Sequence, residues 1–173
     1  MADQRLNHIL ERRSIRNYTE QPVADHLIKE LLHAAMCAPS ACNQQPWHFI
    51  VIRDREVLRQ IAAIHAGFQV LQGAPLAILV CGEPRAAVLE FFWQQDCAAA
   101  TENILIAAQA SGLGAVWLGI HPDGGEDADQ IRKLVQLPSF IQPFALVSAG
   151  YPAEQKAPSE RFKEERVHFQ NYW

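Results

Sequence analysis

The chain has 173 residues, of which 49% are hydrophobic and 20% charged, a composition that predicts one soluble globular domain over residues 1–173. Its net charge of −4 at pH 7 gives no electrostatic reason to expect nucleic acid or an anionic membrane surface as a partner, and no apolar run reaches the ~18 residues that cross a membrane. The polar first residues exclude a secretory signal and the four scattered cysteines exclude a disulfide scaffold, so we expect a cytoplasmic protein with reduced thiols.

The first half of the chain predicts three helices and two strands. Helices are expected over roughly residues 3–12 and 24–37, because apolar residues recur there at helical spacing. The run WHFIVIR (47–53) predicts a buried strand, after which Asp54 caps the next helix. The continuous apolar run PLAILVC (75–81) is bounded by glycines, as is typical of a central strand.

The second half predicts two further strands with a helix between them. The strands are expected over residues 114–120 and 143–151, and the helix over about 126–137. Residues 82–95 show no clear pattern, although three aromatic residues cluster at 91–93. Since strands and helices alternate along the chain, we expect a sheet covered by helices, of the α/β or α+β class.

One predicted helix has more apolar surface than a small domain can cover. The segment DCAAATENILIAAQASG (96–112) carries small or aliphatic side chains on nearly all sides. A helix that is apolar all round is buried on all sides. We therefore expect a partner subunit to cover part of it; the alternative is a central helix wrapped by its own chain.

Three arginines and a serine stand together in the sequence RRSIR (12–16). The planar guanidinium fork donates two hydrogen bonds at once, which suits a phosphate group. In an extended segment Arg12, Ser14 and Arg16 share one face, so the three side chains can grip a ligand that carries a phosphate. The alternative is a solvated helix end whose positive charges match the helix dipole.

Two loops beside predicted strands are further candidates. The small and amide residues of APSACNQQPWHF (38–49) predict either a plain turn or a loop whose backbone comes close to a ligand. In SGLGAVWLGIHP (111–122), Gly112 is expected to end the long helix, and Gly119 allows a ligand to approach the strand. The order helix to strand is the reverse of the dinucleotide fingerprint, which argues against a classical nucleotide-binding fold.

Other chemistries have little support in the sequence. The chain has no HxxxH or HExxH pair, no Walker loop and no GxSxG elbow. Cys37 and Cys42 lack a second ligand pair for zinc, so no metal is expected. A cysteine nucleophile at one of these positions stays open, because its histidine partner need not be near in the sequence.

Taken together, RRSIR, APSACNQQPWHF about 25 residues later, and GLGAVWLGI resemble the FMN-dependent nitroreductase family over nearly the whole chain. The element PSxxNxQPW is the most specific of the three. The resemblance implies an α+β, nitroreductase-like fold with a central, mainly antiparallel sheet flanked by helices. It also implies an intertwined homodimer that holds two FMN molecules at its interface, which supplies the partner for the apolar helix.

The resemblance further implies that each flavin site is shared between two subunits. One subunit would supply Arg12, Arg13, Ser14 and Arg16. Arg12 and Ser14, together with Arg161 of the charged tail, match positions near the ribityl phosphate. Arg16 matches the basic residue that faces N1 and the C2 carbonyl of the ring.

The remaining positions that the resemblance implies come from the loop, from one strand and from one amide. The other subunit would supply four loop residues, Pro39, Ser40, Ala41 and Asn43. The backbone of Leu118 and Gly119 matches the strand that donates to the N5 and O4 edge, and Gln69 matches an amide contact. Some relatives have an acidic residue where Leu118 stands, so only its backbone role is expected. Longer members carry helical excursions where residues 82–95 are short, and the aromatic residues there either line the substrate cleft or serve packing.

The activity implied is hydride transfer by the flavin, with the protein supplying orientation and electrostatics and no side-chain nucleophile. Arg16 would stabilise the anion that forms at N1 of the reduced ring. We expect NADH or NADPH as electron donor and nitroaromatic, quinone or related acceptors, which bind alternately in a ping-pong cycle. The alternative function is a non-catalytic flavin-binding carrier or sensor.

Overall fold

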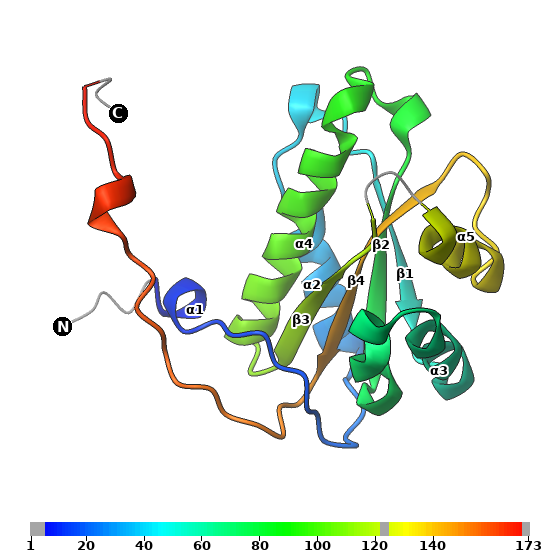
Figure 1. Ribbon diagram of the computed structural model, residues 1–173, viewed down its shortest axis with the longest axis horizontal. Helices are drawn as coiled ribbons and strands as arrows, with labels where there is room; N and C mark the ends of the chain where they lie inside the picture. Colours follow the sequence, from blue (N-terminus) through cyan, green and yellow to red (C-terminus); the bar gives the residue numbers. More distant parts are fainter. Residues whose placement is uncertain (1–5, 122–124, 171–173) are drawn as a thin grey trace.

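A four-stranded antiparallel sheet lies between two layers of helices in the computed structural model, which describes residues 6–121 and 125–170 (Figure 1). The strand order is β1-β2-β4-β3, and every neighbouring pair is antiparallel. The strands are β1 (Trp47–Ile52), β2 (Leu76–Gly82), β3 (Gly114–Gly119) and β4 (Gln142–Gly150). The predicted strands and the α+β class are therefore confirmed.

Strand β2 is buried along its whole length because helices cover both faces of the sheet. Its residues alternate between two cores, as strand geometry requires. Ile78 and Val80 pack with α2 (Asp25–Met36) and α4 (Trp93–Ala110). Ala77, Leu79 and Cys81 pack with α3 (Arg55–Ile64) and α5 (Gly125–Leu134) on the other face.

Local capping chemistry places several helix ends where the sequence predicts them. The Asp54 carboxylate accepts from the backbone N–H groups of Glu56 and Val57, at 2.8 and 3.2 Å, and begins α3. Gly112 adopts a φ of 72° and ends α4, while the N–H of Leu113 donates back to the Ala108 carbonyl at 2.8 Å. A 3₁₀ helix over Ala66–Gly73 was not predicted.

The segment between β2 and α4 consists of two short 3₁₀ turns, Pro84–Ala86 and Glu90–Phe92, and α4 begins at Trp93. Trp93 packs so closely on the end of β2 that a Cβ on Gly82 would come within 2.3 Å of its Cε3 atom. Trp93 is therefore a packing residue, whereas Phe91 is 71% exposed.

Apolar surface remains uncovered in the single chain. Helix α4 buries one side against α2 and the sheet, while Ala98, Ala99, Ile106 and Ala107 on its other sides stay half-buried. Figure 1 shows α1 (Asn7–Leu10) and the C-terminal tail beside each other, outside the sheet and its helices. The helix predicted over residues 3–12 is thus observed over Asn7–Leu10, and residues 3–5 lie outside the described part. Ile9 and Leu10 of α1 are 54% and 55% exposed, and Phe162 of the tail is 73% exposed.

Candidate functional site

The arginine segment is extended and crosses beside the start of β3. The N–H of Ile15 donates to the Ala115 carbonyl at 3.0 Å, and Ser14 forms a parallel bridge with Ala115. Ile15 is buried, whereas Arg12 and Ser14 are half-buried and Arg16 is exposed. The predicted alternation is therefore confirmed, and Arg12, Ser14 and Arg16 lie on one side of the segment.

Arg13 lies on the opposite side from the other two arginines. Its Nε donates to the carbonyl of Ala157 at 3.0 Å, and its Nη1 donates to the carbonyls of Leu10 and Arg12 at 3.0 and 2.6 Å. The residue is 8% exposed, and within the described part of the chain its Nη2 has no hydrogen-bond partner. The side chain of Arg13 therefore fastens the segment to the tail and does not join the shared face.

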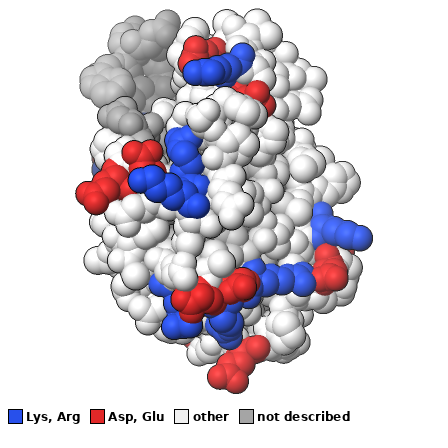
Figure 2. Space-filling view, turned by 90° about the vertical axis from the view of Figure 1, so that its right-hand side faces the viewer, with Lys and Arg blue, Asp and Glu red and all other residues white. Residues whose placement is uncertain are grey.

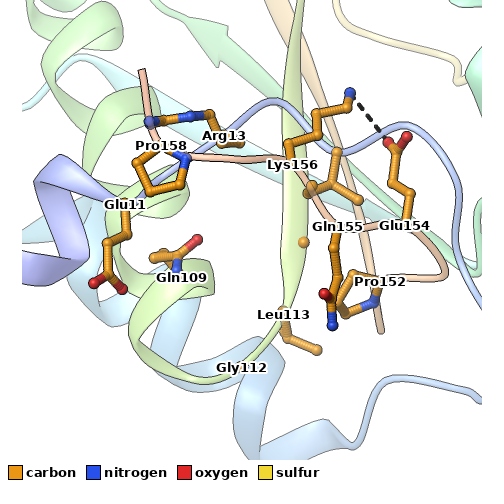
Figure 3. A pocket seen from close by; sticks show the side chains of 12 residues that line it. Glu11, Arg13, Gln109, Gly112, Leu113, Pro152, Glu154, Gln155, Lys156 and Pro158 are labelled. Atoms are coloured by element: carbon orange, nitrogen blue, oxygen red, sulfur yellow. Dashed lines mark ion pairs between the residues drawn. The ribbon is translucent and has the colours of Figure 1, made fainter. Parts of the chain in front are cut away.

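Residues 151–157 form a strap that runs beside the arginine segment and binds its backbone; several strap side chains are drawn in Figure 3. Glu154 accepts from the backbone N–H of Arg16 at 2.6 Å and of Asn17 at 3.3 Å. Lys156 pairs with Glu154 at 3.2 Å and donates to the Ser14 carbonyl at 2.6 Å. The hydrogen bond from the Arg16 backbone is the largest cause that lowers the pKa of Glu154 from 4.5 to about 2.

A cavity of about 460 Å³ lies between the strap, the arginine segment and the turn from α4 into β3 (Figure 3). Its lining carries two acidic and two basic side chains, Glu11, Glu154, Arg13 and Lys156. These mixed charges do not favour an anion. Because the cavity lies on the Arg13 side, we place the candidate ligand site on the other side, where Arg12, Ser14 and Arg16 lie.

Arg12 reaches the middle of α4. Its Nε lies 3.4 Å from a carboxylate oxygen of Glu102, and its side chain is 18% exposed. The two Nη groups of a guanidinium whose Nε is engaged remain suited to a bidentate contact. Arg161 lies farther along the exposed tail, where its Nε donates to Ser159 Oγ at 3.0 Å.

The loop between α2 and β1 has an unusual backbone. Cys42, Asn43 and Gln45 have φ values of 50°, 54° and 46°, in the left-handed region that residues other than glycine rarely adopt. Ser40 Oγ accepts from the backbone N–H of Gln45 at 3.0 Å, and Asn43 Oδ1 accepts from the Gln45 side chain at 2.9 Å. The loop is therefore held in one shape by its own polar side chains, with Pro39 and Asn43 exposed.

Two side chains that the sequence did not single out, Asp96 and Gln44, fix this loop to neighbouring segments. The buried Asp96, in the first turn of α4, accepts from the Ala41 N–H at 2.9 Å and from Gln44 Nε2 at 2.6 Å. Gln44 in turn pairs with both backbone groups of Leu89. An acidic side chain in the first turn of a largely apolar helix is the signal that could have identified Asp96.

The remaining predicted positions fall into two groups. Leu118 is buried, whereas Gly119 at the end of β3 is exposed, and nothing lies within 4 Å of where a Cβ would stand on it. The strand backbone is thus open to close approach at Gly119. Gln69 lies in the 3₁₀ helix before β2 and uses its amide locally, since Nε2 donates to the Ala62 carbonyl at 2.7 Å and Oε1 accepts from Gln72 at 2.6 Å.

A single chain does not bring the loop and the arginine face together. Ala41 meets α4 at Asp96, whereas Arg12 meets it at Glu102, six residues later, which is ~9 Å along the helix axis and about 120° around it. Ser14 lies beside Ala115, beyond the other end of α4. The two groups therefore lie on different sides of this helix.

The described residues offer little for thiol or metal chemistry. Burial raises the pKa of Cys81 to about 12 and that of Cys97 further, so both thiols stay protonated, while Cys37 and Cys42 are exposed. Over residues 6–121 and 125–170, no group of three or more His, Cys, Asp or Glu side chains could hold a metal ion. None of the helices described is both long and apolar enough to cross a membrane.

The surface on the side of α3 and α5 carries mixed charge. Figure 2 shows positive and negative side chains interspersed on this face. Several of them form ion pairs there, among them Arg59 with Glu56 and Arg132 with Asp129. Among the described residues of this face, positive side chains therefore alternate with negative ones.

Comparisons with known proteins agree on one family. The model of the nitroreductase family matches residues 9–69 and 65–151. A protein of Archaeoglobus fulgidus, whose name proposes an NADH dehydrogenase/NAD(P)H nitroreductase, is 45% identical over 94% of this chain and 95% of its own length. A structure from Parabacteroides distasonis with the same proposed name superposes with a TM-score of 0.93 at 35% identity, covering 99% of each chain.

A third relative was solved with a cofactor. It comes from Desulfovibrio desulfuricans and is described as a proposed nitroreductase in complex with FMN; it superposes with a TM-score of 0.83 at 34% identity, covering 99% of each chain. The matched residues include both the arginine segment and the loop before β1. On the strength of the family match and these similarities, the chain belongs to the nitroreductase family.

Proposed function

We propose that this protein is an FMN-dependent oxidoreductase that takes electrons from NADH or NADPH and passes them to nitroaromatic, quinone or related acceptors. The observation that carries the proposal is the shared face of Arg12, Ser14 and Arg16. An FMN phosphate is a dianion, and this face presents two guanidinium groups and a hydroxyl. The open backbone at Gly119 fits the close approach of a flat ring.

In this proposal each residue has a binding or an electrostatic task. Arg12 and Ser14, with Arg161 from the tail, hold the phosphate, and the backbone of Leu118 and Gly119 orients the ring edge. Arg16 brings a positive charge to the N1 and C2 carbonyl edge, where a cation favours electron uptake. When bound, FMN supplies the hydride chemistry itself.

Two other predicted residues act less directly. Arg13 holds the segment in place through its bonds to three backbone carbonyls. The Gln69 amide is already engaged with Ala62 and Gln72, so a contact to flavin requires it to exchange these partners.

We further propose that the site is shared by two copies of the chain in an intertwined homodimer. Pro39, Ser40, Ala41 and Asn43 of one copy then meet the arginine face of the other. The separation of these groups within one chain supports this arrangement, as do the exposed apolar residues of α1 and the tail. The free thiols of all four cysteines support a reducing, cytoplasmic location.

Anaerobic spectroscopy tests the function. The purified protein, supplied with FMN, is expected to be yellow, to lose its colour when NADH or NADPH is added, and to regain it with a nitroaromatic compound. Alternate binding of donor and acceptor predicts parallel lines in double-reciprocal plots at several fixed donor concentrations. A protein that binds FMN but is not bleached by either nucleotide is a carrier or sensor, and one that binds no FMN overturns the proposal.

A further inference from the structure

Asp96 is a buried carboxylate for which the proposed function has no task. It is 5% exposed, and no lysine, arginine or histidine in the described part of the chain forms an ion pair with it. Burying an unpaired carboxylate is costly unless hydrogen bonds satisfy it. Its two oxygens are satisfied by different parts of one loop, Oδ1 by the Ala41 N–H and Oδ2 by Gln44 Nε2.

Gln44 also forms hydrogen bonds to Leu89, in the segment that follows β2. Its Oε1 accepts from the Leu89 N–H at 2.9 Å, and its Nε2 donates to the Leu89 carbonyl at 3.3 Å while also serving Asp96. Leu89 lies between the two 3₁₀ turns of residues 84–92, the segment that exposes Val88 and Phe91. The loop before β1 and the segment after β2 are thus joined through two side chains.

The loop needs an external support because its backbone is strained. Three of its residues other than glycine have positive φ, a strained conformation that persists only where the surrounding structure enforces it. The bond from Asp96 to the Ala41 N–H and the bond to Gln44 hold the loop on both sides of the left-handed pair Cys42 and Asn43.

We propose that Asp96 is a positioning residue which, through Gln44, fixes the loop at residues 41–45 for the flavin and couples it to the segment at residues 84–92. This rests on the proposed function, in which Ala41 and Asn43 contact FMN. A displacement of either segment is then transmitted to the other, so the exposed apolar side chains of residues 84–92 keep a fixed distance from the cofactor.

The polarity of the chain of hydrogen bonds allows an isosteric test. A carboxylate only accepts, whereas an amide accepts on one side and donates on the other. With Asp96→Asn, an NH₂ donor faces the NH₂ donor of Gln44. With Gln44→Glu, two acceptor-only carboxylates face one another. In the double variant the new amide at position 96 donates to the new carboxylate at position 44, which still accepts from the Leu89 N–H. The bond to Asp96 is thereby replaced, while the longer bond from Gln44 Nε2 to the Leu89 carbonyl is lost.

The dissociation constant of FMN, measured by quenching of flavin fluorescence, is the primary readout. Each single variant is expected to weaken binding about tenfold to a hundredfold, the range for one lost hydrogen bond to a charged group. The double variant is expected to recover in part and to bind FMN more tightly than either single variant, since it remakes the bond between positions 96 and 44 but not the bond to the Leu89 carbonyl. Gln95→Glu, at an exposed neighbour of Asp96, makes the same charge change as Gln44→Glu; it is the control and is expected to stay within about twofold.

Three outcomes are distinguishable. A parent protein that binds no FMN overturns the proposed function and this inference with it. A parent that binds FMN, with single variants that bind equally well or a double variant no better than the singles, overturns the inference alone. If the variants do not fold, amide hydrogen exchange in the unaltered FMN-bound protein decides, because coupling predicts that the Ala41 and Leu89 amides open together, with protection within about tenfold of one another; a larger difference overturns it.

Discussion

At the scale of single residues, Glu154 shows how one carboxylate can order a binding segment. Its depressed pKa of about 2 arises first from the Arg16 backbone N–H. Because the folded-state pKa lies below the ordinary value of 4.5, this carboxylate stabilises the fold above about pH 4.5, and the contribution is lost as the pH falls toward 2.

We therefore expect Glu154→Gln to lower the free energy of unfolding at neutral pH, by an amount that narrows between about pH 5 and about pH 3. Urea unfolding of the two proteins across this range measures the difference. Glu165→Gln in the exposed tail is the matched control. A Glu154→Gln effect that is the same at every pH would show that the ionised carboxylate contributes nothing specific.

Arg16 is the residue on which the proposed electrostatics depend. Arg16→Ala is expected to slow flavin reduction by NADH or NADPH about a hundredfold, as the loss of one preorganised stabilising group does in other enzymes. Arg16→Lys separates charge from geometry, because it keeps the cation and loses the planar fork. Stopped-flow absorbance under anaerobic conditions measures the rate; an unchanged rate with weaker FMN binding in both variants would reduce Arg16 to a binding role.

The sequence predicts the local pattern around these residues better than their distant partners. Alternation alone places Arg12, Ser14 and Arg16 on one face and Arg13 on the other, which the structure confirms. The support from Glu154 was missed because it lies 138 residues from Arg16, and no local periodicity reports such a contact. Asp96 and Gln44 were missed for the same reason, since they lie 52 residues apart.

At the scale of secondary-structure elements, the start of β3 sets the position of the arginine segment. A Cβ on Gly114 would lie 2.6 Å from Ile15 Cγ2, and Ile15 is only 7% exposed and has little room to move. Gly114→Ala is therefore expected to destabilise the protein by about 1–3 kcal/mol and to weaken FMN binding as the segment shifts.

Thermal or chemical unfolding, together with FMN titration, checks this expectation. Gly73→Ala is the matched control, because nothing lies within 4 Å of a Cβ at that position. If the two alanine variants were equally stable, close packing at Gly114 would not be what holds the segment.

Elements with a strong pattern were predicted and weak ones were not. The apolar run of β2 and the cap at Asp54 identify their elements from local chemistry alone. The 3₁₀ helix at Ala66–Gly73 and the turns of residues 84–92 have no periodicity of their own. They are shaped by tertiary packing, such as that of Phe68 and Leu71 in the core and of Trp93 on Gly82, which a sequence pattern does not contain.

At the scale of the whole molecule, the proposal that two chains share each site predicts complementation between two defective chains. Arg16→Ala damages the site through one copy and Asn43→Ala through the other, so a mixed dimer keeps one intact site. Random mixing of equal amounts, by unfolding and refolding together, is expected to restore about a quarter of the original activity.

Sedimentation provides the control for this experiment. Each variant alone is expected to sediment at about twice the chain mass of 19.4 kDa, since neither substitution removes the apolar contacts of a symmetric pair. A monomer at micromolar concentration, or a mixture no more active than its components, would show that each site is built by a single chain.

The strap at residues 151–157 also constrains when the protein can become functional during synthesis. The arginine segment leaves the ribosome early, yet the groups that fix it, such as Glu154, are made more than a hundred residues later. A nascent chain therefore carries its cluster of positive charge without fixed geometry until residues 151–157 have been made. Acquisition of the proposed cofactor should accordingly follow the synthesis of the strap, so that a nascent chain lacking residues 151–157 retains no FMN.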